Sequence, residues 1–169
     1  MIDAQIVDKL LSVLERETYL YVRLGEIAVQ IQEIIVMNDA EMLSKRINEE
    51  DSLLKRAEQL RQERFSILMQ IKTSLHLSDR ELTLGKLLEF VSEADAALIQ
   101  EQRKRLADAV TRLENINKTN NALVKYSLDL NAKFMNLLVN IGQNNTVYKP
   151  SGKISDQPNG KKRLLDKKV

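Results

Sequence analysis

Residues 6–34 read IVDKLLSVLERETYLYVRLGEIAVQIQEI, and their apolar side chains recur at alternating intervals of four and three. The repeat runs over four heptads, and Glu17 is the one charged residue among its nine positions. Apolar residues at this spacing share one face of an α-helix and form the seam of coiled-coil-like packing. The pattern therefore predicts a long helix over residues 3–37 that packs against other helices.

A second helix is predicted to follow after a very short connection. Asn38, with Glu41 three residues later, resembles a capping box that opens this helix, which we expect over residues 39–76. A connection this short makes the first two helices antiparallel neighbours. Another capping box, SDRE at residues 78–81, then predicts a short helix that extends to Val91.

The apolar spacing resumes in a last long helix, which we expect over residues 95–141, with Gly142 as its C-terminal cap. The predicted fold is therefore all-α, an elongated antiparallel helical hairpin or bundle with coiled-coil-like packing and a flexible C-terminal tail. We expect the core to include the following residues: Leu24, Ile31, Leu54, Leu60, Leu113 and Ile116.

Composition changes after Ile141. Both prolines and three of the five glycines follow it, and residues 142–169 hold seven basic and two acidic residues. Residues 1–141 hold 19 basic and 22 acidic residues, so the body is weakly acidic and the tail is basic. A segment of this kind buries too little apolar surface to offset its ordering entropy. We expect a helical domain over 1–141 and a flexible basic tail over 142–169.

Several classes of function find no support in the residues. The chain has no cysteine, and His76 is its single histidine. We find no phosphate-binding glycine loop, no histidine pair spaced for a metal and no serine elbow, so we expect no enzyme, no cofactor and no metal site. No signal peptide or membrane-spanning stretch is recognisable, which favours a cytoplasmic protein without membrane insertion.

The basic tail raises the question of nucleic-acid binding, because its seven cations could contact phosphates. However, Tyr148 is its single aromatic residue, and no nucleic-acid-binding module precedes it. A solubilising or protein-docking tail is favoured, and no nucleic-acid partner is expected.

Two polar residues, Asn120 and Ser127, occupy seam positions of the last helix. A buried Asn in a helix seam costs stability and specifies register or partner, whereas a peripheral position carries no such meaning. A third interpretation is that this face is not permanently buried and receives an incoming amphipathic helix.

Two stretches resemble the FlgN-type flagellar export chaperones. Residues 116–124 (INKTNNALV) are similar to the LNxxNxxLL stretch of that family, and residues 146–153 (TVYKPSGK) to its TxYxxxG tail. The ending Gly160-Lys161-Lys162 is also similar, although Pro150 departs from the tail motif. The resemblance extends over nearly the whole chain.

This resemblance implies a chaperone for the hook-associated proteins of the hook–filament junction. It implies that their FlgK- and FlgL-like C-terminal helices bind to the last helix, and that the tail docks on the export gate component FlhA. By this match Asn117, Asn120 and Leu123 fall in the client-binding helix. The seam and flank of the same helix add the remaining candidate client-binding residues: Val124, Ser127, Leu130, Phe134 and Leu137. The implied gate-docking residue is Tyr148.

Two alternatives remain open from the sequence. The chain could be a structural coiled-coil adaptor that self-associates through its last helix, or, more distantly, a nucleic-acid binder that acts through its basic tail.

Overall fold

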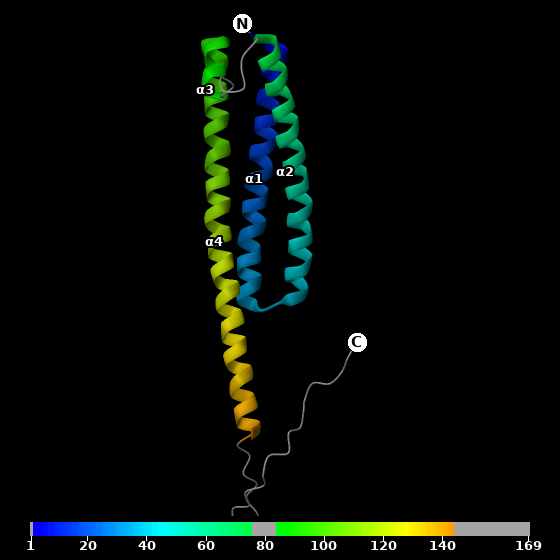
Figure 1. Ribbon diagram of the computed structural model, residues 1–169, viewed down its shortest axis with the longest axis vertical. Helices are drawn as coiled ribbons and strands as arrows, with labels where there is room; N and C mark the ends of the chain where they lie inside the picture. Colours follow the sequence, from blue (N-terminus) through cyan, green and yellow to red (C-terminus); the bar gives the residue numbers. More distant parts are fainter. Residues whose placement is uncertain (1, 76–83, 144–169) are drawn as a thin grey trace, which may run out of the picture. The chain divides into compact units, whose positions relative to one another are not determined.

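The computed structural model describes residues 2–75 and 84–143, and these residues are all-α (Figure 1). The elements are α1 (Ala4–Met37), α2 (Ala40–Leu75), the one-turn helix α3 (Leu84–Leu87), the 3₁₀ turn η1 (Leu88–Phe90) and α4 (Glu93–Gln143). No described residue lies in a strand, so the predicted fold class is confirmed. Each long helix begins and ends within two residues of its predicted bounds.

The chain divides into two compact units, residues 1–126 and 127–169, which are described separately. The first unit contains α1, α2 and the larger part of α4, and α1 lies between the other two helices (Figure 1). The described part of the second unit is the C-terminal part of α4. The expected domain boundary after residue 141 stays a prediction.

The connection between α1 and α2 is a left-handed turn at Asn38, whose φ is 56°. Its backbone N–H donates to the carbonyl of Ile35 at 3.2 Å, so Asn38 ends α1. Asp39 caps α2, because its Oδ1 accepts from the N–H of Met42 at 2.9 Å. The prediction that Asn38 caps the second helix was wrong. The chain needs a left-handed residue at the end of α1, and Asn tolerates this conformation better than most residues. Asn38 therefore ends α1, and the next residue caps α2.

Side-chain caps also open the other long helices. Asp3 Oδ1 accepts from the N–H of Gln5 at 2.9 Å at the start of α1. Ser92 Oγ accepts from the N–H of Asp95 at 3.1 Å and donates to its carboxylate at 2.7 Å, which opens α4. The predicted capping box at residues 78–81 lies outside the described residues.

The core of the first unit consists of two apolar clusters along α1. The first contains Val7, Leu10, Val13, Leu14, Ile67, Ile71, Leu87 and Ile99, and the second contains Leu24, Ala28, Ala57 and Leu113. Each cluster joins residues of α1, α2 and α4, so burial holds the three helices together. Each fully buried Leu or Ile contributes about 1.5–3 kcal/mol to this packing.

Four of the six predicted core residues, Leu24, Ile31, Leu60 and Leu113, are buried, and Ile116 is partly buried. Leu54 is 48% exposed, so that prediction was wrong. At 100° per residue, Leu54 lies about 100° around α2 from the centre of its buried residues. Ala57 and the neighbouring Leu53 pack on the core instead.

Candidate functional site

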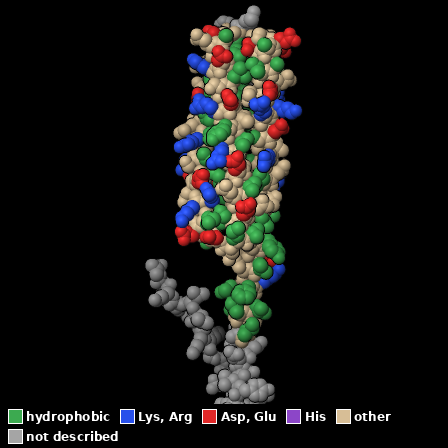
Figure 2. All heavy atoms as spheres, turned by 180° about the vertical axis from the view of Figure 1, so that it is seen from behind, with side chains coloured by type: hydrophobic (Ala, Val, Ile, Leu, Met, Phe, Trp, Pro, Cys, Tyr) green, Lys and Arg blue, Asp and Glu red, His purple; other side chains and the backbone are tan. Residues whose placement is uncertain are grey.

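The C-terminal part of α4 exposes a dense group of large apolar side chains. Eight of them between residues 127 and 141 are 47–64% exposed: Leu128, Leu130, Phe134, Met135, Leu137, Leu138, Val139 and Ile141. Figure 2 shows apolar side chains gathered on this end of the helix. Exposed apolar patches of this density mark sites of interaction with other proteins or with membranes. We call residues 127–141 the apolar end of α4.

The apolar end carries little charge. Its two ionic residues, Asp129 and Lys133, pair with each other at 2.7 Å between Oδ2 and Nζ. Both are exposed and one helical turn apart, so their pairing contributes only a few tenths of a kcal/mol. The pair leaves the segment neutral, which favours an apolar partner surface over a charged one.

The structure spreads the expected client-binding residues over two environments. Leu130, Phe134 and Leu137 lie in the apolar end and are exposed. Ser127 is partly buried. Upstream, in the first unit, Asn117 and Leu123 are partly buried, and Val124 is 38% exposed.

Asn120 belongs to the interior of the first unit. It is 8% exposed, and its Nδ2 donates to the carbonyl of Ala28 in α1 at 2.7 Å. Its Oδ1 is buried without a hydrogen-bond partner. The side chain therefore contacts α1 and is not presented to a client in this structure. Its placement matches the interpretation of a seam residue that fixes helix register.

Glu17, the charged break in the first heptad run, is buried between α1 and α2. Its Oε2 accepts from Arg64 Nε at 2.7 Å, and its side chain is 2% exposed. Burial raises the pKa of Glu17 above its ordinary value of 4.5, while Arg64 and, more weakly, Arg61 oppose this shift. The sequence analysis did not predict the Glu17–Arg64 ion pair. The signal for it was a glutamate at a seam position, where a buried charge needs a partner.

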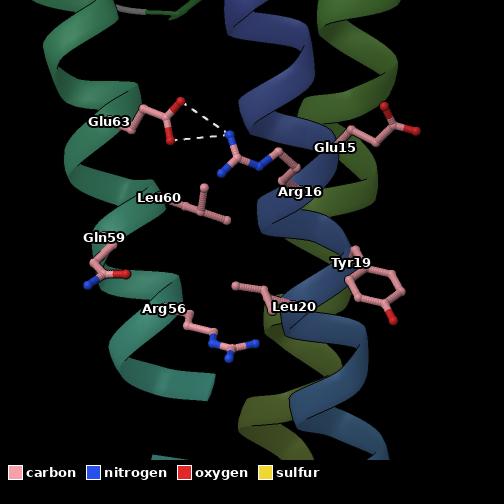
Figure 3. Close-up of a pocket in the computed structure, with 8 residues that line it drawn as sticks. All are labelled: Glu15, Arg16, Tyr19, Leu20, Arg56, Gln59, Leu60 and Glu63. Carbon is pink, nitrogen blue, oxygen red and sulfur yellow. Dashed lines mark hydrogen bonds and ion pairs between the residues drawn. The ribbon is translucent and has the colours of Figure 1, made fainter. Parts of the chain in front are cut away.

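A shallow groove of about 660 Å³ lies between α1 and α2 (Figure 3). Arg16 spans it, and its Nη1 donates to both Glu63 oxygens at 3.2 and 3.3 Å. Leu20 and Leu60 point into the space between the two helices, Arg56 extends from α2 toward α1, and Tyr19 lies on the side of α1 that faces away from α2. The groove is lined by two arginines and two glutamates, so its net charge is zero. This arrangement is typical of an exposed seam between two helices.

A family model described as FlgN protein matches residues 1–156. The chain belongs to the FlgN protein family. Comparison with curated proteins and with solved structures gives no match. The FlgN match includes residues 116–124 and 146–153, the two stretches on which the resemblance was based.

FlgN proteins are flagellar export chaperones, so membership of the family gives the chain a general role in flagellar protein export. The family is not known to contain enzymes. Within the described ranges no helix is apolar enough over sufficient length to cross a bilayer. Tyr148, the expected gate-docking residue, lies outside the described residues, as does His76.

Proposed function

We propose that the chain is a cytoplasmic FlgN chaperone that binds C-terminal amphipathic helical segments of hook-associated junction proteins, the FlgK- and FlgL-like clients. Binding covers the segments through which these proteins later assemble, so it prevents their premature association. The single observation that carries this proposal is the exposed, neutral apolar end of α4.

The mode of recognition is that of a helix laid against an apolar helical surface. An amphipathic client helix exposes the same kind of stripe in the cytoplasm, and both partners gain by removing it from water. The client is ordered only on binding, and this cost keeps the affinity moderate and the complex reversible. Release therefore needs no chemical step in the chaperone.

Delivery is assigned to the tail. Tyr148 docks on the export gate component FlhA while the client remains on α4. This division separates the client surface from the gate contact, so a loaded chaperone presents both at once.

Calorimetry with the full chain tests the proposal. The titrants are the C-terminal region of each junction protein from the same genome and, separately, a generic oligonucleotide. We expect 1:1 binding of a junction protein with weak salt dependence, because apolar contacts dominate, and weak oligonucleotide binding that falls steeply with salt.

Leu130→Lys is the test variant and Asn140→Lys is its matched control on the polar side of the same helix. Leu130→Lys should weaken client binding, and Asn140→Lys should not. Concentration-dependent self-association in place of client binding would favour the structural adaptor. Tight oligonucleotide binding at physiological salt would favour the nucleic-acid binder.

A further inference from the structure

We draw no further inference here: the strongest candidate, the exposed apolar end of α4 over residues 127–141, belongs to the site already described, and nothing in the described part of the chain shows what covers it.

Discussion

Arg64→Met tests how the bundle tolerates the buried carboxylate of Glu17. Arg64 supplies a charge-assisted hydrogen bond of 2.7 Å, and its side chain is 25% exposed whereas that of Glu17 is 2% exposed. Methionine retains much of the apolar stem and removes the charge. The substitution therefore leaves Glu17 buried without its main partner.

The size of the effect is limited by protonation. A buried carboxylate that has lost its partner takes up a proton when keeping it ionised costs more free energy than protonating it. From an ordinary pKa of 4.5, protonation at pH 7 costs about 3.4 kcal/mol and at pH 5 about 0.7 kcal/mol. We expect Arg64→Met to lower the free energy of unfolding by about 2–3 kcal/mol at pH 7 and by less than about 1 kcal/mol at pH 5.

The sign follows from proton linkage. A carboxyl whose pKa is raised in the folded state binds its proton more tightly there than in the unfolded chain. Stability therefore falls as pH rises from 4.5 through the folded pKa. Removing Arg64 raises the pKa of Glu17 further and extends this window toward neutral pH. Burial also raises the pKa of Glu50, which acts in the same direction, but Glu50 is present in every variant and cancels in the comparison.

Urea denaturation followed by circular dichroism at pH 5 and pH 7 measures the effect. The control is Glu17→Met/Arg64→Met, which removes both charges and should be at least as stable as the unaltered chain, with no pH dependence from this site. Equal losses for Arg64→Met at the two pH values, or no loss at pH 7, would refute the reasoning.

Three further predictions concern other parts of the chain. Leu24→Ala should cost about 2–5 kcal/mol in urea denaturation, because Leu24 is fully buried, whereas Phe134→Ala should change stability by less than about 0.5 kcal/mol; similar losses would show that the apolar end is part of the core. Asp39→Ala should cost about 1 kcal/mol by the same measurement through loss of the cap on Met42, and an unchanged midpoint would contradict that role. Tyr148→Ala should leave calorimetric client binding intact and lower export in a secretion assay, and loss of client binding would assign the tail to the client site.

The helices were predictable from the sequence because their apolar spacing extends over many turns. α1, α2 and α4 each begin and end close to the predicted bounds, and capping residues account for their starts. The expectation that Gly142 ends α4 was wrong, because the helix continues through it to Gln143. The turn was assigned incorrectly by one residue because Asn suits both a helix start and a left-handed helix end. The sequence alone does not decide between these two positions. The φ of 56° at Asn38 shows that it ends α1.

The burial of individual residues was less predictable. Leu54 and Leu60 both belong to apolar runs in α2, yet one is 48% exposed and the other is 7% exposed. The spacing in this helix is less regular than in α1, so several faces fit the pattern nearly equally well. Packing against α1 selects one of them, and this choice depends on side chains that are distant in the sequence.

The candidate site shows a different limit. The four-and-three spacing of α4 runs from Leu113, which is 7% exposed, to Ile141, which is 55% exposed, with Asn120 and Ser127 as its two polar positions. Periodicity reports that a helix has an apolar face, but it does not report whether anything covers that face.

The polar residues at seam positions complete this argument. Glu17 and Asn120 both interrupt an apolar stripe, and each makes a buried polar contact with another helix, Glu17 with Arg64 and Asn120 with the carbonyl of Ala28. Such contacts disfavour alternative registers, because a shifted helix would leave a buried charge or amide without its partner. Beyond Asn120 the next polar seam residue is Ser127, and the large apolar residues that follow it are exposed. The same α4 therefore combines a part fixed in register within the first unit with an apolar end whose large side chains are exposed.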